Sequence, residues 1–310
     1  MTQDIQIKSV TKVFETGIRS RKTAVDNLTL DIPRGEVVGL LGANGSGKST
    51  TLKMILGFLR PTSGNILIAG VTAGTRASRT HLGYLPENPR FQRFLRGRSI
   101  LEYIGRLHRM SGAGLSRRCT ELLELVGLEH AGGERVQGYS KGMIQRLAIA
   151  QALINRPKIL IFDEPMSGLD PLGRMEIRNL IARIHQEMPE ATLFFSTHIL
   201  SDAEALCSSV ALLKQGKLKV NCPIAQLIQN EPENYELTLT NVSPALQTEL
   251  AAAHSLTASP LGFSFSLNGT AALQKEIGRL SAAGAKILSV YTKRGSLEKT
   301  LFSDSARETA

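Results

Sequence analysis

The chain has 310 residues and a mass of 33.6 kDa, and its 42% hydrophobic and 21% charged residues are the balance of a globular protein too long for one compact core. Its apolar runs are far shorter than the ~20 residues that span a bilayer, and residues 1–6 lack the features of a secretory signal, so we expect a cytoplasmic protein without a transmembrane helix. The three cysteines are odd in number and form no Cys-x-x-Cys pair, which argues against a disulfide framework and a thiolate zinc site. The formal net charge of +10 indicates a polyanionic partner such as nucleic acid, anionic lipid or a nucleotide.

Three apolar stretches, residues 37–42, 159–163 and 192–198, end abruptly in polar residues. Nearly continuous apolar runs of this length are typical of parallel strands that are covered on both faces. Helical patterns follow the first stretch at residues 48–58 and precede the second at residues 141–155. The alternation predicts an α/β fold of the doubly wound type, in which Gly42, Asp163 and His198 lie at the edge where ligands bind.

Two further regions differ from this pattern. Residues 98–138 have apolar positions at helical spacing, and residues 90–118 carry eight arginines against the single acid Glu102. Beyond residue 220, alternating strands at 235–240 and 263–267, a helix at 271–283 and a strand at 287–291 predict a separate α+β module. We therefore divide the chain into domains at residues 1–220 and 221–310.

The residues that follow the first strand fit the phosphate-binding pattern Gly-x4-Gly-Lys-Ser/Thr. The glycines allow the backbone amides to turn inward around an anion, and the N-terminus of the following helix adds partial positive charge. Lys48 is expected to meet the β- and γ-phosphates and Ser49 to ligate Mg²⁺. The alternative is a glycine-rich turn before an ordinary helix. The pattern comprises Gly42, Ala43, Asn44, Gly45, Ser46, Gly47, Lys48 and Ser49, and Thr50 follows it.

Polar residues also end the other two strands. Adjacent carboxylates such as Asp163 and Glu164 are costly unless a cation or hydrogen bonds hold them. We expect Asp163 to assist Mg²⁺ binding and Glu164 to act as the base that deprotonates the attacking water. An acidic pair without function, and a structural role for His198, are the alternatives weighed against these roles.

The segment between the phosphate loop and Asp163 indicates which class of nucleotide-binding enzyme the chain resembles. Residues 139–153, from Tyr139-Ser-Lys-Gly-Met onward, resemble the signature motif of ABC transporter ATPases. Other elements of that family appear in its order across residues 5–220: Phe14, the phosphate loop, Tyr84-Leu-Pro-Glu87, Ile161-Phe-Asp-Glu-Pro165, Ser167-Gly-Leu-Asp-Pro171 and Ser196-Thr-His198. Residues 296–302 also resemble the C-terminal ending of exporter ATPase subunits.

The resemblance implies a P-loop NTPase fold of ABC type, with residues 1–220 as the nucleotide-binding domain, a helical subdomain at about 88–155 and a small accessory α+β domain. It implies ATP and Mg²⁺ as cofactors, with Phe14 stacking on adenine and the metal near Ser49, Asp163 and Glu87. In the family, Ser140 and Gly142 face the γ-phosphate bound to the opposite subunit of a head-to-tail dimer. Asp170 lies at the dimer seam, and His198 contacts the γ-phosphate and holds the attacking water.

Three positions, in two motifs, depart from the common family pattern. Glu87 replaces the usual glutamine, which changes the charge near the metal. The signature has Lys141 and Met143 where the commoner form has glycine and glutamine, so the side chains that take part in closure of the dimer differ.

Three functions are compatible with these observations. The first is an ATPase subunit at the cytoplasmic face of the membrane that powers export through a separate permease, as a homodimer or with a related ATPase. In the family the basic segment after Glu87 faces the membrane subunits, and its arginines are suited to acidic residues of that partner or to anionic lipid headgroups. The alternative is a solvated helix face. The second is an ABC-type ATPase that acts on nucleic acid or the ribosome, but such relatives commonly carry two nucleotide domains or a coiled-coil insertion, so no nucleic acid is expected. The third, a regulatory subunit without turnover, is disfavoured because Glu164 and His198 are both present. The transported substrate stays open.

Overall fold

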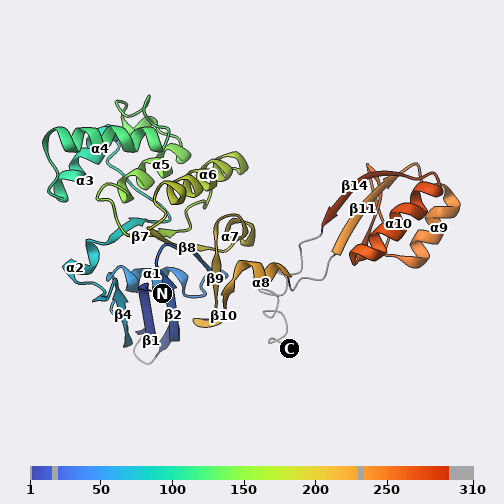
Figure 1. The fold of residues 1–310 in the computed structure, drawn as a ribbon, viewed down its shortest axis with the longest axis horizontal. Helices are drawn as coiled ribbons and strands as arrows, with labels where there is room; N and C mark the ends of the chain where they lie inside the picture. The colour runs from blue at the N-terminus through green and yellow to red at the C-terminus, as the bar shows by residue number, and fades with distance from the viewer. Residues whose placement is uncertain (1, 16–19, 230–233, 293–310) are drawn as a thin grey trace. The chain divides into compact units, whose positions relative to one another are not determined.

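The computed structural model describes residues 2–15, 20–229 and 234–292 (Figure 1). The chain divides into two compact units, Met1–Ala225 and Gln226–Ala310. The division falls after Ala225, a few residues beyond the expected boundary at 220. The segment 296–302, which resembles an exporter ending, lies outside the described residues.

A mainly parallel six-stranded sheet forms the centre of the first unit. Its strand order is β10-β9-β3-β8-β7-β6, and only β10, at one edge, is antiparallel to its neighbour. Every residue of β3, β7 and β8 is buried, which explains the continuous apolar runs of the sequence and confirms the expected α/β fold. The strands are β3 (Val37–Leu41), β6 (Leu82–Leu85), β7 (Ile159–Asp163), β8 (Thr192–Thr197), β9 (Ser209–Lys214) and β10 (Lys217–Pro223).

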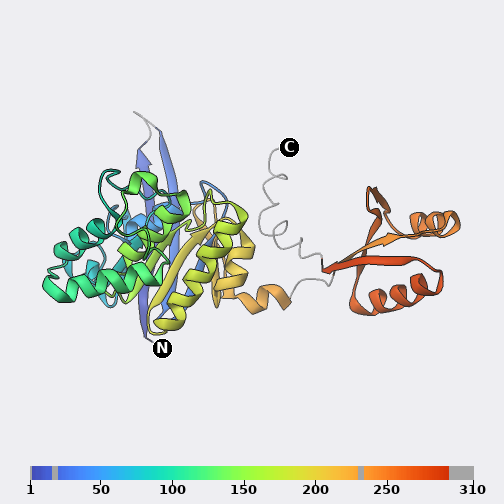
Figure 2. The same cartoon turned by 90° about the horizontal axis from the view of Figure 1, so that it is seen from above.

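A second, antiparallel sheet has the order β2-β1-β4-β5. Its strands are β1 (Gln3–Glu15), β2 (Arg21–Pro33), β4 (Ser63–Ile68) and β5 (Val71–Thr72). Figure 2 shows β1 and β2 as a long two-stranded ribbon. Helix α1 (Lys48–Ile55) shares one core with this sheet and with β3, β7, β8 and β9, through Leu52, Met54 and Ile55.

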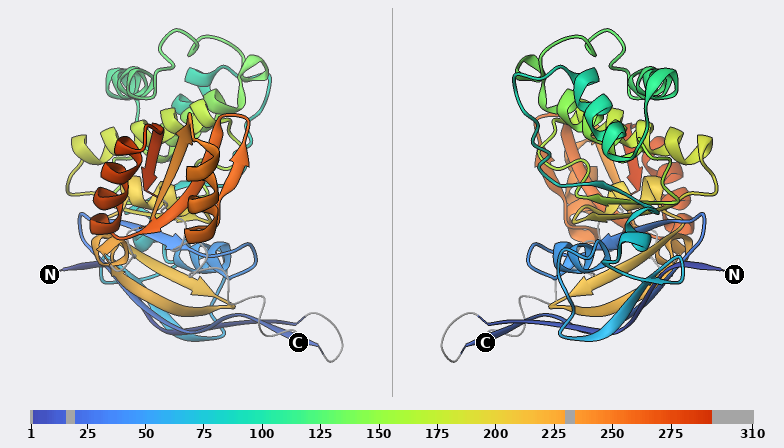
Figure 3. Two further views of the ribbon diagram at one scale, coloured as in Figure 1. Left: turned by 90° about the vertical axis from the view of Figure 1, so that its right-hand side faces the viewer. Right: turned by 90° about the vertical axis from the view of Figure 1, so that its left-hand side faces the viewer.

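Helix α7 (Leu200–Leu206) packs on β3 and β8, and α6 (Pro171–Glu187) contacts α5 and α7. The expected helical subdomain contains α3 (Gly97–Leu107), α4 (Gly112–Leu125), a 3-10 turn at Val136–Gly138 and α5 (Lys141–Ala152). Figure 3 shows these helices on the side of the six-stranded sheet opposite to β1 and β2. The short helix α2 (Arg76–Arg79) lies between β5 and β6 in sequence.

Two expected helices are shorter than predicted. Helix α1 ends at Ile55 rather than at residue 58, because Gly57 adopts a left-handed conformation with φ +72° that stops the helix. Helix α5 ends at Ala152 rather than at residue 155, where Arg118 donates a hydrogen bond of 2.6 Å to the carbonyl of Leu153. None of the helices in the described ranges has the length and apolar character needed to cross a bilayer.

The second unit has its own core. Its elements are β11 (Asn234–Thr240), α9 (Pro244–Ala253), β12 (Thr257–Ser259), β13 (Gly262–Asn268), α10 (Thr270–Ala282) and β14 (Lys286–Thr292), preceded by α8 (Ile224–Gln229). The antiparallel strand order β12-β13-β11-β14 and the β-α-β-β-α-β sequence are those of a ferredoxin-like module. Leucines of α9 and α10 pack with Leu237, Leu239 and Phe265 of the sheet in one apolar cluster.

Candidate functional site

The loop between β3 and α1 wraps around the side chain of Lys48. The Lys48 ammonium group is buried, donates hydrogen bonds to the carbonyls of Gly42 (2.7 Å) and Ala43 (3.3 Å), and pairs with Glu164 Oε1 at 3.3 Å. Gly47 caps α1 with φ +110° and offers no side-chain acceptor, so the first amides of the helix are left for a ligand. A Cβ at Gly47 would lie 2.5 Å from the carbonyl oxygen of Ala24, which explains why glycine is required there.

Asp163 ends β7 beside the loop. Its Oδ1 accepts a hydrogen bond of 3.3 Å from Ser49 and one of 2.7 Å from Ser196. Burial, and then the charges of Asp163 and Glu87, raise the pKa of Tyr84 to about 12. The Ser49 hydroxyl lies beside the Asp163 carboxylate, and hydroxyl and carboxylate oxygens are ligands that Mg²⁺ accepts.

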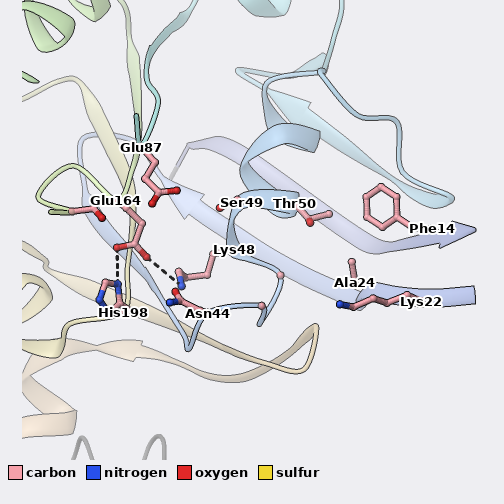
Figure 4. A pocket seen from close by; sticks show the side chains of 13 residues that line it. Phe14, Lys22, Ala24, Asn44, Lys48, Ser49, Thr50, Glu87, Glu164 and His198 are labelled. Atoms are coloured by element: carbon pink, nitrogen blue, oxygen red, sulfur yellow. Dashed lines mark hydrogen bonds and ion pairs between the residues drawn. The ribbon is translucent and has the colours of Figure 1, made fainter. Parts of the chain in front are cut away.

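The Glu164 carboxylate contacts the side chains of Lys48 and His198. Its Oε1 faces Lys48, and its Oε2 lies 2.9 Å from Nδ1 of His198 (Figure 4). The carboxylate is almost completely buried, whereas the His198 side chain is 41% exposed at the cavity. A buried carboxylate in contact with an imidazole and an ammonium group has the chemistry of a general base.

These residues line a cavity of about 330 Å³, the size of a small-molecule site. Figure 4 shows Glu164 and His198 at one end and Phe14 and Lys22 at the other. Ten of the predicted site residues line the cavity: Phe14, Asn44, Gly45, Gly47, Lys48, Ser49, Thr50, Glu87, Glu164 and His198. Gly42, Ser46 and Asp163 do not line the cavity but belong to the same loop and strand ends, where Ser46 and Asp163 are buried.

Three predicted residues are not brought to this cavity. Ser140 caps α5 by accepting a hydrogen bond of 3.2 Å from the amide of Met143, and Asp170 caps α6 in the same way with the amide of Gly173 at 3.1 Å. Ser140 is exposed, and Gly142 follows it in the first turn of α5. Neither these two residues nor Asp170 lines the cavity of the same chain.

Sequence reasoning missed several residues of the site. The cavity is also lined by Ser167 and, on β2, by Lys22 and Ala24. The Ser196 hydroxyl accepts a hydrogen bond of 2.9 Å from the amide of Glu164. The position of Lys22 follows from its pairing with Phe14 across the β1–β2 ribbon, which no motif signals. Within the described residues there is no group of three or more His, Cys, Asp or Glu side chains able to hold a metal.

Comparisons with known proteins agree with this geometry. The protein-family model described as "ABC transporter" matches residues 25–167 of this chain. An ABC transporter ATP-binding protein of Synechocystis sp. strain PCC 6803 is 38% identical over 239 residues, covering 76% of this chain and 67% of the relative. The chain belongs to the ABC transporter ATP-binding protein family. The Nod factor export ATP-binding protein I of Cupriavidus metallidurans is 33% identical to this ABC protein over 256 residues, covering 77% of this chain and 82% of the relative.

A solved structure extends the comparison. The dimeric post-hydrolysis state of the ATP-binding cassette MJ0796, bound to ADP and phosphate, superposes with a TM-score of 0.61 and 28% identity. The match covers 71% of this chain and 98% of the cassette. This ABC protein therefore has the P-loop NTPase fold and is an ATPase that serves as an ATP-binding subunit of a transporter.

Proposed function

We propose that this subunit hydrolyses ATP to power the export of a substrate through a separate transmembrane permease, working at the cytoplasmic face of the membrane. The export direction is supported by the likeness to the Nod factor export protein. A permease partner is supported by exposed large apolar side chains in and just before α3, namely Phe94, Tyr103 and Leu107, within the arginine-rich segment 90–118. Exposed apolar groups rimmed by charge are typical of protein interfaces.

The observation that carries the catalytic proposal is the Glu164 carboxylate held between Lys48 and His198 in the cavity. Lys48 and the amides at the start of α1 bind the triphosphate, and Phe14 provides an aromatic face for the adenine. Ser49, Asp163 and Glu87 would hold Mg²⁺, which neutralises charge on the phosphates when it is bound. Glu164 accepts the proton of the attacking water, and His198 orients that water beside the γ-phosphate.

A head-to-tail dimer completes the proposed site. Ser140, Gly142 and Asp170 lie outside the cavity of their own chain, and the capped N-terminus of α5 offers partial positive charge to a phosphate. We place these residues against the ATP bound by a second cassette, either another copy of this chain or a related ATPase. The dimeric form of the MJ0796 cassette supports this arrangement.

Glu164→Gln tests the proposal. The amide cannot accept the proton of water, so ATP turnover is expected to fall about 100-fold or more while ATP binding is retained. With MgATP, the variant is expected to run as a dimer in size-exclusion chromatography with light scattering. Glu190→Gln, at an exposed glutamate, is the matched control. Turnover by Glu164→Gln at the parent rate would overturn the assignment of the base.

A further inference from the structure

The backbone of Glu164 is in a conformation that glutamate rarely adopts. Its φ is +47°, in the left-handed region that favours glycine. A non-glycine residue stays in this region only where its surroundings hold it there. The direction of the Glu164 carboxylate therefore depends on the contacts that fix the turn around it.

Three hydrogen bonds fix this turn. The amide of Glu164 donates to Ser196 Oγ at 2.9 Å, and its carbonyl accepts the amide of Ser167 at 3.0 Å. The carbonyl of Pro165, the next residue, accepts a hydrogen bond of 2.7 Å from Nε2 of Gln145. The first two bonds come from the sheet and from the turn itself, whereas the third comes from α5.

Gln145 lies in the second turn of α5, the helix that begins at Ser140 with the signature motif. Its side chain points inward, and the residue is only 3% exposed. The next residue of α5, Arg146, forms an ion pair of 3.6 Å with Glu176 of α6. A shift of α5 thus acts directly on the carbonyl next to Glu164.

We infer that Gln145 is a positioning residue that sets the Glu164 carboxylate through the Pro165 carbonyl, so that hydrolysis depends on the position of the signature helix in the same chain. This inference rests on the proposed role of Glu164 as the base. The signature helix is already proposed to contact the ATP of the other cassette. The hydrogen bond of Gln145 would connect the same helix to the base of its own chain.

Gln145→Met tests the inference, because methionine has a similar length and no donor. Turnover (kcat) is expected to fall about tenfold or more, since small displacements of a catalytic group have large effects on rate. The Kd for ATP is expected to stay within about threefold, because Gln145 does not line the cavity. Gln151→Met, on the same helix, is the control and is expected to keep both values.

Gln145→Glu and Gln145→Asn provide independent checks. The glutamate keeps the shape of glutamine but can donate to the carbonyl only while its carboxyl group is protonated, so its kcat relative to the parent is expected to fall as the pH is raised, unlike that of Gln145→Met. The asparagine is too short to reach Pro165 and is expected to lose kcat with unchanged ATP binding, which also serves if the methionine variant does not fold.

The outcomes separate the two proposals. If Glu164→Gln loses turnover but Gln145→Met and Gln145→Glu hydrolyse ATP at the rate of Gln151→Met, the inference about Gln145 is wrong and the base assignment stands. A loss of ATP affinity equal to the loss of kcat would also overturn it, because that result indicates a general structural role. Parent turnover by Glu164→Gln would instead overturn the base assignment, on which the inference about Gln145 rests.

Discussion

The Ser196 hydroxyl connects the two carboxylate residues at the end of β7. It accepts the amide of Glu164 and donates to Asp163, so one buried side chain of β8 fixes both residues. Lys48 likewise contacts several groups, because its ammonium donates to the carbonyls of Gly42 and Ala43 and pairs with Glu164. Ser196 and Lys48 therefore each bond to more than one group of the site. We expect substitutions of the site residues to separate ATP binding from hydrolysis.

Lys48→Ala is expected to weaken ATP binding rather than only slow hydrolysis. Loss of a charge-assisted hydrogen bond to phosphate is expected to raise the Kd about tenfold or more. Isothermal titration with ATP measures this change, and Lys219→Ala, at an exposed position of β10, is the control. Equal Kd values for the two variants would contradict the role of Lys48.

At the scale of elements, a buried ion pair joins α6 to α7. Arg174 donates to Oδ2 of Asp202 at 2.7 Å, and Arg178 lies 3.7 Å from Oδ1. The Asp202 side chain is 2% exposed, whereas the two arginines are 25% and 32% exposed. The pair fixes the helix that follows Asp170 against the helix that follows His198.

Asp202→Asn is expected to destabilise the first unit, because it leaves two guanidinium groups without their carboxylate. Breaking a buried pair costs about 3–5 kcal/mol, and the partial exposure of the arginines reduces this to about 2 kcal/mol. Differential scanning calorimetry should show the transition of the first unit lowered by roughly 4–8 °C. Glu187→Gln, which breaks an exposed pair with Arg183 on the same helix, should shift it by less than half as much. An unchanged transition for Asp202→Asn would show that the pair adds no stability.

Local sequence signals predicted some elements and missed others for physical reasons. Strands β3, β7 and β8 are buried on both faces and have continuous apolar sequences, which made them predictable. Strand β1 has register shifts and a left-handed Ser9, which break the alternation that marks a strand. Most of the cavity residues that belong to the quoted motifs were predicted as site residues. Lys22, Ser167, Ser196 and Gln145 were not assigned, because their roles arise from contacts between elements distant in sequence.

At the scale of the whole molecule, the two units have separate cores, and the apolar side chains around α3 belong to the first. Tyr103 and Leu107 lie one turn apart on α3, while Ile100 and Leu101 of the same helix are buried. The helix therefore presents apolar side chains to solvent as well as to its core. Exposed apolar side chains of this kind are compatible with the permease partner proposed above.

Phe94→Asp tests whether that partner is the permease. Phe94 is 67% exposed, so the substitution is not expected to change the fold or the ATPase rate of the isolated chain. When the chain is co-expressed with a permease from a neighbouring reading frame, the parent is expected in the membrane fraction and Phe94→Asp mostly in the soluble fraction. Leu261→Asp, at a similarly exposed leucine of the second unit, is the control and should follow the parent. Recovery of Phe94→Asp with membranes at the parent level would show that this surface does not hold the permease, and the arginines around it would then be a solvated face.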